Sequence, residues 1–504
     1  MRSSLAATLV GLLAQLSPAQ QSANVTLDTS ETLFTVLTAI NTCGYDAELD
    51  ASDPVRGQIR AEVAKNIEAS AELKTSTGVL CQFYEQHQQP ETARNLAQFV
   101  SVALYLGPPP TFNPKVKEAD MAPDAAAVAG MLPMLQKFYI DAGLHGIWER
   151  HLPAYTALTD RYHTPLAKML FDTEIYLKVP SSGYLGRAFT VFLEPMGAPA
   201  QTNARSYVSD YFVVIAPGKS SNLKMEQIRH TYLHYLLDPL ALKYPEATKR
   251  LVPLLDSLKT APMDESFKND AGLLSTECLI RAIEARTTGP ATTPETERQK
   301  AIAASMGQGF ILTQYFYDAL VQFEKDQVGL RNVYGNMLVG IDVRKEQRRA
   351  AATQFAARAD PEILHLARPA LEGKLLITAE QRLATGDVAA AQKLAQQALD
   401  EKSEDAGRAL FILAEVAVRN KDMSGARNYF EKALGVAHEP KVIVWSHIYL
   451  GRIFDLDEER DAAIDHYRAA LNAGEQLPEA KAAAEQGLQK AYEPPTRPQP
   501  AEPQ

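Results

Sequence analysis

The sequence predicts a mainly α-helical protein in which an α+β middle domain with a small antiparallel sheet is followed by a C-terminal α-solenoid. Three observations lead to this prediction. Apolar residues recur at spacings of three and four over the first third of the chain, as on one face of a helix. Two short runs near the middle alternate with a period of two and are rich in aromatic and β-branched residues. A helical segment then recurs in the C-terminal third.

Length and composition are those of an ordinary soluble protein. With 504 residues the chain is long enough for two or three packed units. The hydrophobic fraction of 46% and the charged fraction of 22% are typical of globular proteins. The net charge of −10 is mild, and no run of Lys and Arg could neutralise a phosphate backbone or an anionic bilayer. We therefore expect neither nucleic acid nor a membrane surface as a partner.

The N-terminus resembles a bacterial export signal. Arg2 precedes an apolar stretch from Leu5 to Leu16, and the small-residue pattern Ser17-Pro18-Ala19 suits a signal peptidase. We expect residues 1–19 to be removed and the mature chain to be periplasmic or secreted, without insertion into the membrane. An uncleaved membrane anchor is the alternative. No later segment offers the roughly 18 to 20 apolar residues that a membrane helix needs.

The chain has three cysteines. An oxidising compartment permits one disulfide, for which Cys43 and Cys81 are the natural pair, with Cys278 left over. The alternative is that all three are small buried core residues.

Residues 20–165 form the predicted N-terminal helical region, where Leu33, Val36, Leu37 and Ile40 illustrate the helical spacing. The α+β middle domain is expected over residues 166–345. Its predicted strands are 189–193 and 211–215, and a helix should run from about Leu223 until Asp238-Pro239 stops it. A connecting helix is predicted over residues 346–372.

Three segments between residues 373 and 474 align as repeats. Their anchor alanines, Ala391, Ala426 and Ala463, are 35 and 37 residues apart. A second position four residues later is Ala395, Phe430 or Tyr467, and a third small position is Ala398, Ala433 or Ala470. Small residues at a helix crossing let two backbones approach, and a large residue fills the space to the next repeat.

This pattern resembles the tetratricopeptide repeat (TPR) family, whose first helix carries a small residue after Leu. Leu413-Ala414 and Leu450-Gly451 match that position, whereas the first unit has Thr378-Ala379 and is a degenerate or capping repeat. The resemblance implies an α-solenoid over 373–474, whose concave surface takes a peptide or a partner helix. We expect a capping helix over 475–492 and a Pro-rich disordered tail over 493–504. Unrelated Ala-rich hairpins are the alternative.

One pair of residues could hold a metal. His230 and His234 are four apart on a predicted helix and therefore share one face, a spacing that lets two imidazoles reach one zinc ion. Met225, Ile228, Tyr232 and Leu236 are predicted to form the core stripe of that helix, with the histidines at its edge.

The order of hairpin, helix with HxxxH and later helix resembles the gluzincin class of zinc metallopeptidases, whose motif is HExxH. The resemblance implies a zincin-like fold over residues 166–345 and zinc ligands at His230, His234 and Glu277, with Glu284 as the second choice for the third ligand. Thr231 stands where the class has its general base, and threonine cannot take a proton from water at neutral pH. Glu226 is a remote substitute, so we assign no catalytic residue.

A structural interpretation of the same residues stays open. The histidines could simply hydrogen-bond to carboxylates, and Glu277, Arg281 and Glu284 are spaced for ion pairs on one helix face. The sequence contains no Gly-rich phosphate loop, GxGxxG, GxSxG or CxxC motif, so no cofactor-binding residue is assigned. The expected function is protein–protein interaction by an exported TPR protein with an inactive metallopeptidase-like domain. The alternative is a zinc-dependent hydrolase with an atypical base.

Overall fold

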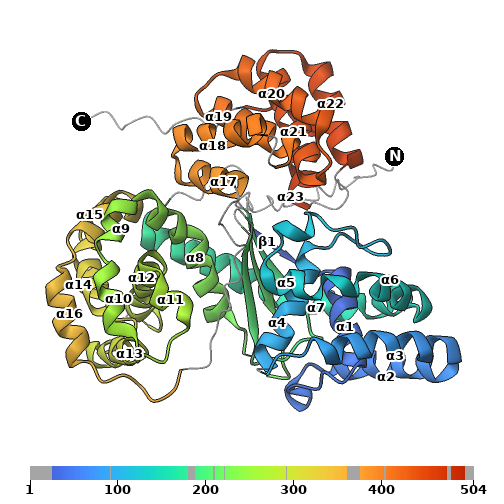
Figure 1. Ribbon diagram of the computed structural model, residues 1–504, viewed down its shortest axis with the longest axis horizontal. Helices are drawn as coiled ribbons and strands as arrows, with labels where there is room; N and C mark the ends of the chain where they lie inside the picture. Colours follow the sequence, from blue (N-terminus) through green and yellow to red (C-terminus); the bar gives the residue numbers. More distant parts are fainter. Residues whose placement is uncertain are drawn as a thin grey trace, which may run out of the picture.

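The computed structural model describes residues 25–90, 92–179, 188–207, 210–220, 222–290, 292–359, 375–401, 404–473 and 478–493. The predicted signal peptide and almost all of the predicted Pro-rich tail lie outside these residues. Helices make up most of the described chain, and a four-stranded sheet lies between two groups of them, with a third helical group alongside (Figure 1).

The N-terminal group follows a short strand and covers one face of the sheet. Helices α1, α2 and α3 begin at the caps Ser30, Asp53 and Ser70, whose side chains accept hydrogen bonds from backbone amides of the first turn. The elements of this group are α1 (Glu31–Thr42), η1 (Leu49–Ala51), α2 (Pro54–Ala69), α3 (Ala71–Gln86), α4 (Thr92–Tyr105), η2 (Glu118–Asp120), α5 (Pro123–Val128), η3 (Ala129–Met131), α6 (Leu132–Asp141) and α7 (Leu144–Leu177).

Two features fix this group. A disulfide joins Cys43 to Cys81 and so links the end of α1 to α3, as the predicted pairing has it, while Cys278 is a buried free thiol. Helix α7 runs through residue 165, the predicted domain boundary, and its first half packs with the N-terminal helices while its second half packs on the sheet. The N-terminal helices and the sheet therefore share one long helix.

The sheet is mixed, so the prediction of an antiparallel sheet was wrong. Its strands are β1 (Val25–Asp28), β2 (Ala188–Leu193), β3 (Thr202–Tyr207) and β4 (Asp210–Ile215), in the order β1-β2-β4-β3. The two predicted strands correspond to β2 and β4, which pair in parallel. Of the described strand pairs, only that between β3 and β4 is antiparallel. Period-two alternation is the same for both pairings, because side chains alternate between faces in either case.

The two faces of the sheet belong to different cores. Phe189, Val191 and Leu193 pack against α7 and α8, whereas Phe192 lies against the N-terminal helices. Helix α8 (Met225–Lys243) does not stop at Pro239 as predicted. The proline removes one amide donor, but the helix continues because Leu240 and Ala241 beyond it are buried in the next core.

That core belongs to the second helical group, which surrounds α12 and is drawn in green to yellow in Figure 1. Its elements after α8 are α9 (Pro245–Lys249), α10 (Val252–Leu255), η4 (Asp256–Leu258), α11 (Glu265–Asn269), α12 (Ala271–Thr287), α13 (Glu295–Gly307), α14 (Thr313–Phe323), α15 (Leu330–Val339) and α16 (Val343–Ala352). Of the connecting helix predicted over 346–372, only the part that overlaps α16 is helical in the structure. Residues 353–359 are not helical, and residues 360–374 lie outside the described residues.

The C-terminal group consists of three successive helix pairs and a final helix, drawn in orange to red in Figure 1. The first pair contacts α8 through α17, and ion pairs Lys441–Asp210 and Lys117–Asp405 also tie the group to the rest of the chain. We call these helices the array: α17 (Leu375–Thr385), α18 (Val388–Glu401), α19 (Ala406–Arg419), α20 (Met423–Val436), α21 (Pro440–Leu456), α22 (Arg460–Ala473) and α23 (Pro478–Gln489).

Small residues lie where the array helices cross. Ala391, Ala426 and Ala463 are fully buried, and a Cβ on Gly407 would lie 2.6 Å from the Cα of Ala437. Gly435 on α20 has space around it, in contrast to Gly407, because a Cβ there would meet nothing within 4 Å.

Replacing Gly407 with alanine is therefore expected to destabilise the array by about 1–3 kcal/mol, since α19 cannot move away from backbone without losing its packing. Gly435→Ala should be neutral or stabilise it by roughly 0.5–1 kcal/mol through helix propensity. Urea unfolding followed by Trp445 fluorescence in a Trp148→Phe background measures both. Equal midpoints for the two variants would contradict the close approach at Gly407.

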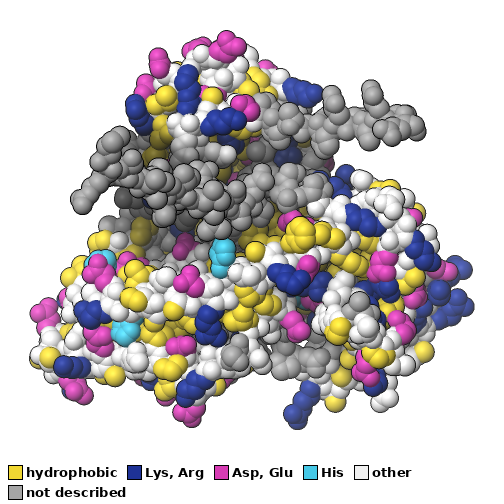
Figure 2. Space-filling model, turned by 180° about the vertical axis from the view of Figure 1, so that it is seen from behind, with side chains coloured by type: hydrophobic (Ala, Val, Ile, Leu, Met, Phe, Trp, Pro, Cys, Tyr) yellow, Lys and Arg dark blue, Asp and Glu magenta, His cyan; other side chains and the backbone are white. Residues whose placement is uncertain are grey.

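Within the described residues, no helix combines the length and the apolar character needed to cross a membrane. On the face of the molecule in Figure 2, acidic and basic side chains are interspersed rather than gathered by sign.

Candidate metal centre

Helix α8 lies between two cores and presents a different side chain set to each. Tyr232 and Tyr235 pack on the sheet, whereas Leu233 and Leu237 pack against the core around α12. His230 and His234 lie on the side of α8 from which they reach Glu277 of α12. The histidines were predicted to lie at the edge of the core stripe of α8. Helix α12 packs against that edge, so both imidazoles are buried.

The three predicted ligands come together. The Nε2 atoms of His234 and His230 lie 3.1 Å and 3.4 Å from Oε2 of Glu277, and the ligand atoms of all three residues lie within 4.8 Å of one another. Tetrahedral zinc with bonds of 2.0–2.1 Å would space its ligand atoms about 3.3 Å apart. The two nitrogen-to-oxygen distances therefore match the spacing that zinc requires.

The other nitrogen of each imidazole has a carboxylate partner. Nδ1 of His230 lies 2.8 Å from Glu284, and Nδ1 of His234 lies 2.9 Å from Asp238. In metal sites, such carboxylates fix the tautomer and orientation of a histidine so that the remaining nitrogen faces the ion. Here they leave both Nε2 atoms facing the same oxygen of Glu277.

Further contacts hold these carboxylates in place. Arg281 donates a hydrogen bond of 2.6 Å to the other oxygen of Glu277, and its guanidinium lies over the ring of Phe310. Tyr211 of β4 donates to Asp238. The sheet, α8 and α12 thus all contribute to the cluster.

The charges of the cluster leave room for a divalent cation. Glu277, Glu284 and Asp238 carry three negative charges and Arg281 one positive charge, so these four groups leave a formal charge of −2 once zinc has displaced the protons of the imidazoles. Burial opposes charge on His230, but Glu284 and Glu277 outweigh it and raise the pKa of His230 to about 10. Burial likewise opposes ionisation of Glu277, yet His230 and Arg281 hold the pKa of Glu277 well below its usual range.

The residues at the base position are not placed for proton transfer. Thr231 is fully buried, and its hydroxyl donates to the backbone oxygen of Gln227 in the preceding turn. Glu226, the remote substitute, lies exposed in the first turn of α8. Glu284, the second choice for the third ligand, instead supports His230.

Asp238 belongs to the cluster, although the sequence predicted only a helix end at Asp238-Pro239. Its position four residues after His234 puts the two on one face of a continuing helix, and this spacing was the available signal. The predicted ion pair between Glu277 and Arg281 forms, but Glu284 pairs with the histidine.

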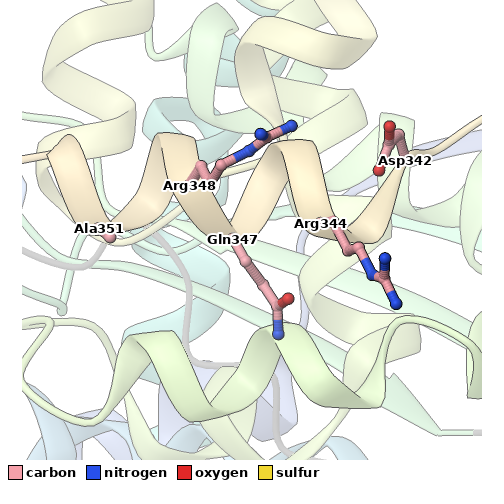
Figure 3. Close-up of a pocket in the computed structure, with 5 residues that line it drawn as sticks. All are labelled: Asp342, Arg344, Gln347, Arg348 and Ala351. Carbon is pink, nitrogen blue, oxygen red and sulfur yellow. The ribbon is translucent and has the colours of Figure 1, made fainter.

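A surface hollow along α16 is a weaker candidate. Asp342, Arg344, Gln347, Arg348 and Ala351 line it, and Figure 3 shows that the side chains of Arg344, Gln347 and Arg348 point in different directions. The hollow involves neither α8 nor α12. Because its polar groups do not converge, the cluster around His230 and His234 is the better site.

Comparisons of the chain with protein-family models, with curated proteins and with solved structures gave no match.

Proposed function

We propose that the chain is an exported protein that binds another polypeptide through a tetratricopeptide array and holds a zinc ion at His230, His234 and Glu277 without peptidase activity. The observation that carries the zinc proposal is the pair of carboxylates, Glu284 and Asp238, behind the two imidazoles. A bound zinc ion would supply a Lewis acid and lower the pKa of a coordinated water.

The types of the three protein ligands, the two nitrogen-to-oxygen distances and the formal charge of the surrounding groups suit zinc. Hydrolysis by the ordinary route of the gluzincin class would also need a base within reach of water, and Thr231 has its hydroxyl bonded to its own helix. This supports a protein that binds the metal but lacks peptidase activity. The alternative, a zinc-dependent hydrolase with another base, is favoured by the three-ligand set, because catalytic zinc sites keep one position open.

The test of these two functions uses the purified full chain. We expect about one zinc per chain, the stoichiometry of a single site, and no cleavage of casein above a zinc-free blank. Casein cleavage that depends on zinc and disappears in His234→Gln would establish the hydrolase instead.

Removing the carboxylate behind His230 tests the proposed role of that group. Glu284→Ala is expected to weaken zinc binding by about 10–100-fold, the usual cost of losing such a partner. The matched control is Glu226→Ala, an exposed carboxylate on α8 one turn before His230, which should leave the affinity within about twofold because it lies outside the cluster. Competition with a chromophoric chelator measures both affinities. An unchanged affinity in Glu284→Ala would contradict the assignment.

The array supports the partner-binding part of the proposal. Its helices form successive pairs with buried alanines at their crossings, which is the packing that the proposed tetratricopeptide fold requires. Phe411 of α19 and Trp445 of α21 flank Tyr449 at ring-centroid distances of 6.2 Å and 6.0 Å, and both keep part of their surface exposed. Partly exposed aromatic side chains are typical anchors of protein interfaces.

The partner experiment uses the full chain as bait for envelope proteins. A protein retained by the wild type and by Phe171→Ala, which removes an exposed aromatic ring from α7, but lost from Trp445→Ala would support binding by the array. Equal retention by all three baits would argue against it.

The disulfide between Cys43 and Cys81 supports export, because such bonds persist in oxidising compartments.

A further inference from the structure

A second pair of histidines lies in the array, far along the chain from the candidate metal centre. His447 of α21 and His466 of α22 face each other with their Nδ1 atoms 3.0 Å apart. Both side chains are partly buried at the crossing of the two helices. The ring of Phe454 stacks on His466 at a centroid distance of 5.2 Å.

The contact between the two imidazoles depends on their protonation. When both rings are neutral, one Nδ1 carries a proton and donates it to the lone pair of the other. When both rings are protonated, neither nitrogen can accept, and two like charges stand at hydrogen-bond distance. The same contact therefore stabilises the crossing in one state and repels in the other.

The charged groups around the pair do little to offset that repulsion. Arg427 and Glu431 of α20 and Asp465 of α22 act on His466, but Glu431 is engaged in an ion pair of 3.1 Å with Arg427. The setting differs from that of His230 and His234, whose imidazoles contact carboxylates directly. Burial, followed by the neighbouring His466, lowers the pKa of His447 to about 4, and burial also lowers the pKa of His466.

We propose that His447 and His466 form a pH-sensitive contact that holds α21 against α22 at neutral pH and opens this crossing when both rings are protonated. The terminal helix α23 would follow, because two residues of α22 anchor it. Tyr467 fits against Gly487 of α23, and Arg460 donates to the backbone oxygens of Gly487 and Leu488.

The direction of the pH dependence follows from the lowered pKa values. A histidine whose pKa is lower in the folded state than its ordinary value binds protons more readily when unfolded, so stability falls as pH falls between those two values. The contribution of the pair is fully present above the ordinary pKa of histidine and is lost toward the lowered one. The free energy of unfolding of the array should therefore fall in mildly acidic solution.

The chain contains only two tryptophans, and this allows a local measurement. In a Trp148→Phe background of the full chain, Trp445 on α21 alone reports the unfolding of the array. Urea unfolding is followed by its fluorescence between pH 7 and pH 5 in three further variants. His447→Phe and His466→Gln each remove one member of the pair, and His438→Gln removes an exposed histidine just before α21.

Between pH 7 and pH 5, the unfolding equilibrium constant of the background protein is expected to rise about 10-fold more than that of either pair variant. His438→Gln should follow the background protein. Other titrating groups are common to all the proteins and cancel in this comparison. A pair variant that keeps the pH dependence of the background protein within about twofold would overturn the proposal. Any effect on partner binding rests on the proposed function of the array, but this unfolding test does not.

Discussion

Replacing His230 and His234 together with glutamine is expected to reduce zinc in the purified protein from about one equivalent per chain to background. The affinity should fall by more than about 100-fold, because losing a supporting carboxylate alone costs 10–100-fold and this change removes two of three ligands. Tyr211 still donates a hydrogen bond to Asp238 in this variant, so the buried carboxylate behind His234 keeps a donor. Elemental analysis of the dialysed protein measures the outcome.

The matched control for this experiment is His163→Gln, which changes an exposed histidine on α7. It should retain the zinc content of the wild type. Circular dichroism shows whether the double variant keeps its helical content. Undiminished zinc in a folded double variant would place the metal elsewhere on the chain and would contradict the ligand assignment.

The second large effect is expected at Arg56, whose side chain is fully buried among oxygen atoms. Its guanidinium donates to the backbone oxygens of Tyr45, Ala47 and Gly197 and to side chains of α1 and of the turn before α2. Nε of Arg56 donates a hydrogen bond of 2.9 Å to the side-chain oxygen of Asn41. One terminal nitrogen of the guanidinium donates to the hydroxyl of Ser52. This one residue thus ties the start of α2 to α1 and to the loop after β2.

Arg56→Met keeps the length of the side chain but removes every one of these donors. The free energy of unfolding is expected to fall by about 3–5 kcal/mol, since several buried carbonyl groups lose their partner and each such loss costs about 1–3 kcal/mol. Arg60→Met is the matched control, because Arg60 shares Asn41 and Tyr45 as acceptors but keeps 24% of its side chain exposed. Water can replace that guanidinium, so about 1 kcal/mol is expected there.

Urea unfolding with the disulfide intact, followed by the fluorescence of Trp148 in a Trp445→Phe background, distinguishes the two arginines. A loss in Arg56→Met no larger than that in Arg60→Met would show that the buried contacts of Arg56 are not what holds these segments together.

The spacing of His230 and His234 predicted that the two imidazoles lie side by side because it depends only on helix geometry. Two residues four apart share a face whatever surrounds them, and Glu277 lies on the next long buried helix that packs there. Asp238 escaped prediction because Pro239 reads as a stop, and only the burial of Leu240 and Ala241 explains why the helix continues. The burial of His230, His234 and Glu277 likewise results from the packing of α8 on α12, which the local sequence does not indicate.

The sheet was harder to predict than the helices. Strand β1 pairs with β2, which lies more than a hundred residues later, and nothing local in Val25–Asp28 indicates that partner. Strand β3 reads TNARSY, a polar sequence that is buried only because helices and β4 surround it. The helices of the array pack mainly on their neighbours in the sequence, so local helical periodicity is enough to predict them as helices.

The zinc content of the wild-type protein tests the central claim most directly. The full chain, purified without added chelator and dialysed against metal-free buffer, should retain about one zinc per chain, as a site with two imidazoles and a carboxylate would. A folded, disulfide-bonded protein that holds no zinc, and takes up none when a stoichiometric amount is added, would mean that His230, His234 and Glu277 form only a buried ion-pair network.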